Sequence, residues 1–143
     1  MQQSLDGVSV ECKALLVIIN PIKCEILISS PAKRPITYPD LSIDGIHLPV
    51  VSETKLLGVY INSSLKWDSH VEYMCKKVRK CFFILYRAKQ FKFNFSTMFT
   101  LYSWFIRTSL EYATPVWHPG ISTKHSLTLE RIQKRCFRVI LGN

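Results

Sequence analysis

Hydrophobic and polar positions follow two different patterns along the chain, and the change falls near residue 66. In residues 1–65, apolar residues come in short runs or alternate with polar ones, which is typical of strands joined by turns. In residues 66–143 they recur at three- and four-residue steps, which is typical of helices that pack on one face. We therefore expect an α+β fold in which a small antiparallel β-hairpin unit is followed by a three-helix region, the two forming one continuous structural unit.

The first 40 residues contain two apolar segments and a proline-rich stretch. Ala14–Ile19 is the longest purely apolar run, and it fits the buried face of either a helix or a strand, because periodicity does not separate the two over so short a run. Lys23–Ser29 predicts a short strand. Pro31, Pro35 and Pro39 then predict a loop.

Two features in residues 41–61 predict antiparallel pairing. Asp44-Gly45 lies between alternating runs and predicts a hairpin, because its turn needs the positive φ that Asp and Gly tolerate. Lys55–Ile61 predicts a further strand, in which Gly58 indicates a bulge or a close approach to the backbone.

Three helices are predicted after Trp67, over Ser69 to about Arg87, Ser96–Ala113 and Lys124–Leu141. Ser69 and Glu72 fit a capping box, Gly142 fits a C-terminal cap, and Glu130 and Lys134 are spaced for an ion pair along one helix. The side chains that we expect to be buried are Val71, Met74, Val78, Phe82 and Leu85 in the first helix, Met98, Leu101, Tyr102, Phe105 and Tyr112 in the second, and Leu129, Ile132, Cys136 and Val139 in the third.

Positive charge is the strongest chemical signal of the sequence. The chain has 19 Lys and Arg against 10 Asp and Glu, a formal net charge of +9, which favours polyanionic partners. Nine of these cations fall on two predicted helices, where they form either solvated faces or a surface for nucleic acid. They are Lys76, Lys77, Arg79, Lys80 and Arg87 on the first helix, and Arg131, Lys134, Arg135 and Arg138 on the third.

Other candidate chemistry is weaker. The five cysteines include no Cys-x-x-Cys pair, so neither a disulfide framework nor a zinc site is expected. We interpret Asp68 and Glu72 as residues that stabilise a helix N-terminus and not as metal ligands. We interpret His118 and His125 as loop residues, because no third metal ligand lies near them in the sequence. We interpret the aromatic residues as core rather than as a platform on which bases stack. This set comprises Trp67, Trp104, Trp117 and the Phe/Tyr-rich stretch Phe91–Phe105.

Three stretches carry a family resemblance. Asn20–Leu27, Lys55–Ile61 with Leu65–Val71, and above all Phe105–Gly120 followed by Leu129–Gly142 resemble the end of the reverse transcriptase of LINE-type, non-LTR retrotransposons. The resemblance implies that residues 1–65 are a remnant of the palm edge with a primer-grip hairpin, to which Leu57, Gly58 and Val59 belong. It also implies that the helices form a thumb that holds a primer-template duplex through its backbone.

The polymerase chemistry of that family requires an aromatic-x-Asp-Asp turn whose carboxylates hold two Mg²⁺ ions. The only aspartates here are Asp6, Asp40, Asp44 and Asp68, and no two are adjacent. In the helix that corresponds to residues 1–19, the family often has a Trp before the Cys, whereas this chain has Glu11 before Cys12. We therefore expect no polymerase activity and no cofactor, and the palm and fingers, if encoded upstream, are expected partners.

A shorter segment, residues 56–91, is similar to the N-terminal module of AlkB-type alkylated-DNA-repair homologues. None of the four histidines is followed two residues later by Asp, as an iron dioxygenase requires, so the sequence supports no dioxygenase or methyltransferase activity. Residues 1–9 lack a secretory signal and no apolar run is long enough to span a bilayer, so we expect an intracellular protein, in the nucleus or cytoplasm, without a membrane partner. Two hypotheses stay open: weak, sequence-independent nucleic-acid binding, and a decayed reading frame with no selected function.

Overall fold

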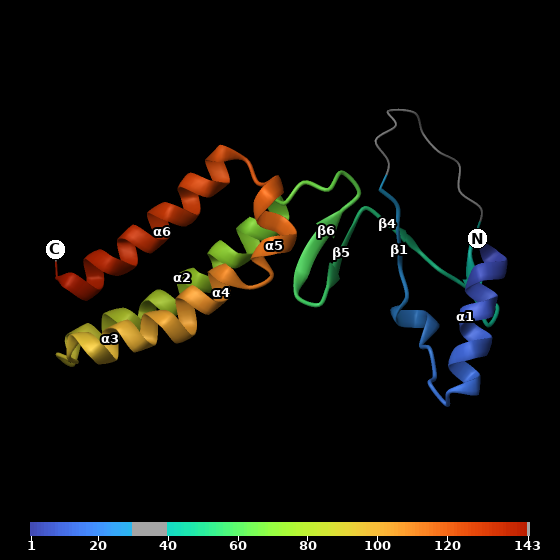
Figure 1. Cartoon of the computed structure of the whole chain (residues 1–143), viewed down its shortest axis with the longest axis horizontal. Coiled ribbons are helices and arrows are strands. Elements are labelled where there is room, and N and C mark those ends of the chain that lie inside the picture. The colour runs from blue at the N-terminus through green and yellow to red at the C-terminus, as the bar shows by residue number, and fades with distance from the viewer. Residues whose placement is uncertain (30–39, 143) are drawn as a thin grey trace. The chain divides into compact units, whose positions relative to one another are not determined.

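The computed structural model describes residues 1–29 and 40–142. The loop predicted from Pro31, Pro35 and Pro39 lies outside the described residues. The fold is α+β, and its contacts divide the chain into two compact units (Figure 1). The first comprises Met1–Thr54 with Asn62–Ser64, and the second comprises Lys55–Ile61 with Leu65–Asn143. The second unit thus takes in Lys55–Ile61, which lies before the predicted change of pattern at residue 66.

In the first unit, helix α1 ends inside the apolar run rather than burying it. The amide of Val17 donates to the carbonyl of Cys12, and that of Leu16 to the carbonyl of Lys13, with Leu16 at φ +59°. These bonds form a Schellman motif, which terminates the helix. The residues after it are exposed, Leu16 at 92% and Ile18 at 93%, so the prediction of a buried face over Ala14–Ile19 is wrong. The elements of this unit are α1 (Gln2–Ala14), a 3₁₀ turn (Pro21–Lys23), β1 (Ile26–Leu27), β2 (Ser42–Ile43), β3 (Ile46–His47) and β4 (Val50–Val51).

The hairpin predicted at Asp44-Gly45 is confirmed. Ile43 pairs with Ile46 in antiparallel register, and the turn residues have φ +50° and +78°, as a type I′ turn requires. The strand predicted over Lys23–Ser29 is shorter, because the Asn20 side chain accepts a hydrogen bond from the Ile22 amide and stabilises a 3₁₀ turn. β1 pairs with β4 in parallel. The prediction of a purely antiparallel β unit is therefore wrong.

The segment around Gly58 is not the single strand that the residue pattern of Lys55–Ile61 predicts, but a hairpin, as the resemblance implies for Leu57–Val59. β5 (Glu53–Leu56) and β6 (Val59–Asn62) pair across a turn in which Leu57 has φ +47° and Gly58 has φ +85°. Of the two roles predicted for Gly58, a bulge or a close approach of another group to its backbone, the second is confirmed. A Cβ atom added to Gly58 would lie 3.4 Å from Cε1 of Tyr112. Gly58 therefore serves both the turn and the packing of the hairpin on the helices.

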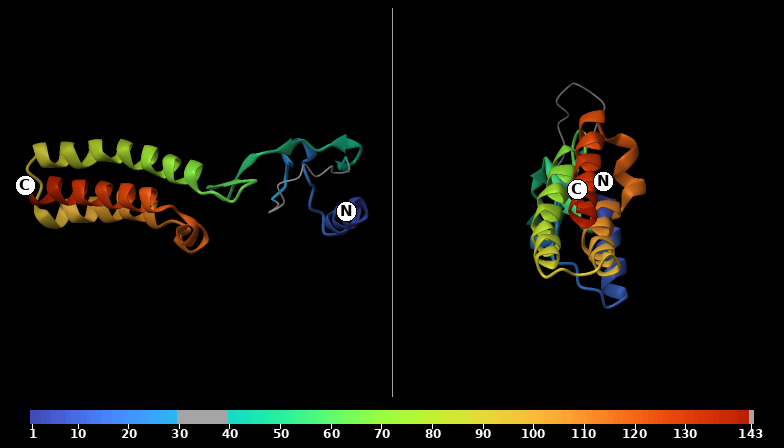
Figure 2. Two further views of the ribbon diagram at one scale, coloured as in Figure 1. Left: turned by 90° about the horizontal axis from the view of Figure 1, so that it is seen from above. Right: turned by 90° about the vertical axis from the view of Figure 1, so that its left-hand side faces the viewer.

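The second unit contains three helical rods that pack side by side (Figure 2). The rods formed by α2 and α6 run parallel, since Asp68 lies beside His125 near their first turns and Tyr86 lies beside Arg135 further along. The rod between α2 and α6 in sequence contacts both of them. The elements are α2 (Asp68–Gln90), then α3 (Phe95–Leu101), a π-helical segment (Tyr102–Arg107) and α4 (Thr108–Glu111) as the middle rod, followed by α5 (Thr114–Trp117), a 3₁₀ turn (His118–Gly120) and α6 (Thr123–Leu141).

The apolar stripe predicted for α2 is confirmed at all five positions, and Ile132, Cys136 and Val139 of α6 are buried as predicted, whereas Leu129 is only partly buried. In the middle rod, Met98 and Tyr102 are buried and Leu101 partly so, but Phe105 and Tyr112 are exposed, which contradicts the prediction. The π-helical segment has more residues per turn than an α-helix, so a four-residue spacing stays on one face. The buried residues of this rod are Met98, Tyr102, Ile106 and Leu110.

Of the three local features predicted for the helices, the C-terminal cap and the ion pair are confirmed and the capping box is wrong. Gly142 caps α6 with φ +86°, and Glu130 Oε1 lies 3.2 Å from Lys134 Nζ. The capping box is wrong, because α2 begins at Asp68, with Trp67 at the N-cap and no capping hydrogen bond from a side chain. Ser69 therefore lies inside the helix, in its first turn.

Candidate nucleic-acid interface

The positive charge of the chain is concentrated in the second unit. Residues 55–61 and 65–143 hold 15 of the 19 Lys and Arg but only four of the 10 Asp and Glu, an excess of 11 positive charges, whereas the remaining residues carry an excess of two negative ones. All nine cations singled out from the sequence are exposed. The helical unit is therefore the part of the protein to which a polyanion is attracted.

Seven of the nine cations fall in two rows, one along α2 and one along α6. On α2, Lys76, Lys80 and Arg87 recur at steps of four and seven residues and lie on one face, and Arg79 lines the groove toward α6. On α6, Arg131, Arg135 and Arg138 recur at steps of four and three residues and lie on one face. The Arg135 guanidinium lies 3.4 Å from Tyr86 Oη and 5.0 Å from the centre of the Phe82 ring, so this row borders α2. We call these seven cations the basic face. They are Lys76, Arg79, Lys80 and Arg87 on α2, and Arg131, Arg135 and Arg138 on α6.

A groove of about 290 Å³ lies between residues 71–79 of α2 and residues 124–128 of α6. Lys76 and Arg79 line it from α2, and Lys124 lines it from α6. Lys124 was not among the nine residues predicted from sequence, since only the parallel packing of the two helices brings it beside Lys76. Glu72 also lines the groove, and the three cations outweigh its charge.

The other two predicted cations lie elsewhere. Lys134 is paired with Glu130 at 3.2 Å, one helical turn earlier. Lys77 lines a separate pocket of about 190 Å³ beside Leu57 and Gly58 of the hairpin. In contrast, no cation of the basic face has a carboxylate partner among the described residues. A phosphate would therefore meet them without first breaking an ion pair.

Asp68 and His125 join the first turns of the parallel helices. His125 Nε2 lies 2.6 Å from Asp68 Oδ1, and the His125 side chain is largely buried. His125 belongs to the first turn of α6, where its amide donates to the Ser122 hydroxyl, so the interpretation of His125 as a loop residue is wrong. The pair holds α2 and α6 in register at the end where the groove lies.

The hairpin residues Leu57, Gly58 and Val59 lie against the helices. Tyr112 Oη donates to the Leu57 carbonyl at 2.7 Å, and Val59 is buried. On the same hairpin, Lys55 Nζ donates to Tyr73 Oη at 3.2 Å, which raises the pKa of Lys55 and lowers the pKa of Tyr73. The Leu57 side chain is exposed and free to meet another molecule.

His70 is the buried polar side chain of the second unit, with 1% of its surface exposed. Its Nδ1 accepts a hydrogen bond from the Tyr60 amide at 3.4 Å, so Nε2 carries the proton. No described residue accepts that proton. The ring meets Trp117 edge-on with centroids 5.6 Å apart, and burial lowers the pKa of His70. The burial of His70 could not be predicted from the spacing of apolar residues, because histidine is polar.

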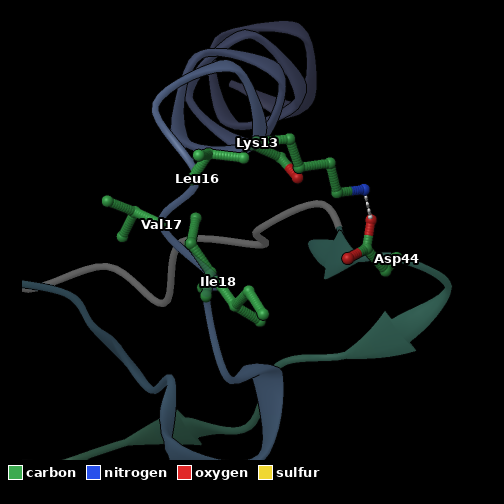
Figure 3. A pocket seen from close by; sticks show the side chains of 7 residues that line it. Lys13, Leu16, Val17, Ile18 and Asp44 are labelled. Atoms are coloured by element: carbon green, nitrogen blue, oxygen red, sulfur yellow. Dashed lines mark hydrogen bonds and ion pairs between the residues drawn. The ribbon is translucent and has the colours of Figure 1, made fainter.

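The first unit has a separate cavity of about 220 Å³ (Figure 3). Leu16, Val17 and Ile18 form its apolar wall, and Lys13 Nζ is joined to Asp44 Oδ1 at 2.7 Å at its edge. The ion pair neutralises both charges, and Ser9 is the other polar residue among those that line the cavity. This cavity therefore has the surface chemistry for an apolar group and not for a phosphate.

Metal and thiol chemistry gain no support from the described residues. They contain no cluster of three or more His, Cys, Asp or Glu side chains close enough to hold a metal ion. Cys136 is fully buried, and burial raises the pKa of its thiol to about 11. The predicted core role of the tryptophans holds for Trp117, is partial for Trp67 and is wrong for Trp104, which is 73% exposed.

Comparison of the chain with protein-family models, with curated proteins and with solved structures finds no match. Within residues 1–29 and 40–142, no helix combines the length and the apolar character needed to cross a bilayer.

Proposed function

We propose that the helical unit binds nucleic-acid duplex through phosphate contacts, without reading sequence. The observation that carries the proposal is the basic face, where seven exposed cations on two packed helices have no carboxylate partner among the described residues. Phosphate contacts of this kind position a duplex but do not discriminate bases. The resemblance to the thumb of LINE-type reverse transcriptases gives the proposal its ligand, a primer-template duplex.

In this proposal the groove between α2 and α6 is the centre of the contact. Lys76, Arg79 and Lys124 face each other across it, and the Asp68–His125 pair fixes the spacing of the two helices. The row of Arg131, Arg135 and Arg138 extends the contact along α6. The proposed role is binding and not polymerisation, because no residue pair here offers the adjacent carboxylates on which two-metal phosphoryl transfer depends.

The test is a titration of the full chain with a fluorescein-labelled RNA–DNA duplex, followed by anisotropy at several salt concentrations. For a B-form duplex, log Kobs falls against log salt by about 0.9 for each phosphate neutralised, and a steep negative slope of this kind is expected. Affinity that does not change with salt concentration, or no binding at low salt, would contradict the proposal.

A matched pair of double variants locates the contact. Arg131→Gln with Arg138→Gln removes two charges from the basic face, and we expect weaker binding and a slope shallower by about two. Arg107→Gln with Lys134→Gln removes two charges that are exposed but already ion-paired, at 2.8 and 3.2 Å, and should leave the slope unchanged. Equal effects of both pairs would show that only net charge matters, which contradicts a located interface.

The alternative of a decayed reading frame is favoured by one observation, the exposure of four consecutive apolar side chains from Leu15 to Ile18. Apolar surface of this kind promotes association when nothing covers it. A chain that aggregates, binds hydrophobic dye and melts without cooperativity supports the alternative. A monodisperse chain with a cooperative transition contradicts it.

A further inference from the structure

Aromatic side chains lie exposed at the end of the bundle where α2 passes into α3. Phe91, Phe93, Phe95 and Phe99 are each 40% or more exposed, which contradicts the prediction that this stretch is core. Three cations interleave with or precede them along the chain. We call this surface the aromatic tip, made of Phe91, Phe93, Phe95 and Phe99 with Arg87, Lys89 and Lys92.

The turn that carries the tip is fixed by hydrogen bonds. The Phe93 amide donates to the Ala88 carbonyl and the Lys92 amide to the Lys89 carbonyl, with Lys92 at φ +55°, so α2 ends in a Schellman motif. Asn94 then caps α3, its side chain accepting from the Thr97 amide at 2.8 Å. The backbone positions of the phenylalanines are thus held by the ends of two helices.

The rings are also held by one another. Phe95 and Phe99 stack with centroids 6.1 Å apart and planes at 19°, and Phe91 lies 6.4 Å from Phe93. Phe99 in turn contacts the buried Tyr102 at 6.1 Å, which ties the group to the core. The rings therefore form a preorganised surface, and a flat ligand would bind with little loss of conformational freedom.

The charge around these rings selects an anionic ligand. Residues 73–110 contain no Asp or Glu, and the Arg87 guanidinium lies 5.3 Å from the centre of the Phe91 ring. A ligand that matches this surface carries negative charge together with flat apolar rings. Single-stranded nucleic acid has both, because its bases are free to stack, whereas those of a duplex are already stacked on one another.

We propose that the aromatic tip binds unpaired nucleotides of a single strand by stacking their bases on the exposed phenylalanines. Arg87 belongs to both the basic face and the tip, so a strand that leaves a duplex on the basic face meets the tip along the same helix. The inference goes beyond the proposed duplex binding, which uses phosphates alone, and it does not require that function.

The decisive probes are two labelled strands of about 12 nucleotides, within the site sizes of single-strand binders. One is oligothymidylate, and the other is an abasic strand with the same number of phosphates. Anisotropy titration of the full chain should show the base-bearing strand bound at least ten-fold more tightly, since one stacked base contributes roughly five-fold to 100-fold. Equal affinity for the two strands would overturn the proposal.

Phe93→Ala with Phe95→Ala should remove this preference while leaving affinity for the abasic strand unchanged. Both side chains are exposed, so the melting temperature should stay close to that of the native chain. Trp104→Ala is the matched control, because Trp104 is a 73% exposed aromatic residue that lies outside the tip, and it should keep the preference. An equal loss in both variants would contradict a located stacking site.

Two further measurements separate this inference from other outcomes. Duplex binding in the same assay tests the proposed function, and its absence would leave the single-strand result standing. Sedimentation with vesicles that contain phosphatidylserine tests the tip against a membrane surface. Vesicle binding that depends on Phe93 and Phe95, without any preference for bases, would assign the tip to lipid and overturn the proposal.

Discussion

Replacing His70 by Phe should remove an acid-sensitive step in the stability of the helical unit. The imidazole is buried, accepts one hydrogen bond from the Tyr60 amide and leaves Nε2 without an acceptor among the described residues. Tyr73, Lys77 and Tyr112 line the adjoining pocket, which contains no carboxylate to stabilise an imidazolium. Protonation would place a positive charge in this environment, and burial accordingly lowers the pKa of His70.

The sign of the effect follows from this direction. Below the pKa of about 6.5 that an unfolded histidine has, the unfolded chain binds a proton that the folded one does not, so acid favours unfolding. The contribution of His70 to stability is therefore fully present above about pH 6.5 and falls by about 1.4 kcal/mol for each pH unit below it, until the folded pKa is reached. Loss of the long Tyr60 bond in the variant should cost about 1 kcal/mol, independent of pH.

Urea unfolding followed by tryptophan fluorescence measures this directly, because Trp67, Trp104 and Trp117 all belong to the helical unit. Native chain and His70→Phe are compared at pH values from 8 to about 5. Both proteins keep the other three histidines, so the difference between the two profiles belongs to His70 alone. Parallel profiles, with the same pH slope in both proteins, would refute the reasoning.

Two further predictions concern the turns and the thiols. Gly58→Ala should destabilise the helical unit by about 1–2 kcal/mol through strain at φ +85°, since the added methyl meets Tyr112 only at contact distance. Gly45→Ala, at φ +78° in the first unit, should leave the unfolding transition of the helical unit unchanged, and urea unfolding monitored by tryptophan fluorescence compares the two. Cys136, with a pKa raised to about 11, should react with an aromatic disulfide reagent at pH 8 only after unfolding, whereas the partly exposed Cys12 and Cys24 should react in the native chain; thiol counts with and without urea check this.

The elements that the sequence predicted correctly are those that local chemistry determines. Asp44-Gly45 supplies the two positive φ angles of its turn without help from distant residues, and Gly142 does the same at the end of α6. The α2 stripe is predictable because a straight helix keeps one phase from Val71 to Leu85. The two turns and the stripe can therefore be predicted without knowing how the helices and strands pack together.

The errors have different physical causes. Phe105 and Tyr112 were assigned to the core from an ideal helical phase, which the π-helical segment Tyr102–Arg107 changes. Leu57-Gly58 was read as part of a strand because leucine at φ +47° is rare in turns, and the hydrogen bond from Tyr112 to the Leu57 carbonyl that supports it comes from 55 residues away. The exposure of Leu16 depends on a Schellman motif without glycine.

The candidate site was predicted in part. Exposure of all nine cations could be inferred from helical spacing, but their division between a shared surface, an ion pair and a pocket could not. That division depends on α6 running parallel to α2, which places Arg135 beside Tyr86 and Lys124 beside Lys76. The spacing of residues within one helix does not determine whether the neighbouring helix runs parallel or antiparallel to it.

Duplex binding on the basic face and single-strand binding on the aromatic tip can be separated by experiment, although both surfaces include Arg87 of α2. The cations of the basic face other than Arg87 act through phosphates, so their removal should change the salt slope and leave the ratio of base-bearing to abasic binding unchanged. The phenylalanines act through bases, so their removal should change that ratio and leave the salt slope unchanged. Arg87→Gln should alter both, since its guanidinium is exposed on the basic face and lies 5.3 Å from the Phe91 ring. If Arg87→Gln changes only one of the two quantities, Arg87 belongs to one surface alone and the two surfaces do not meet there.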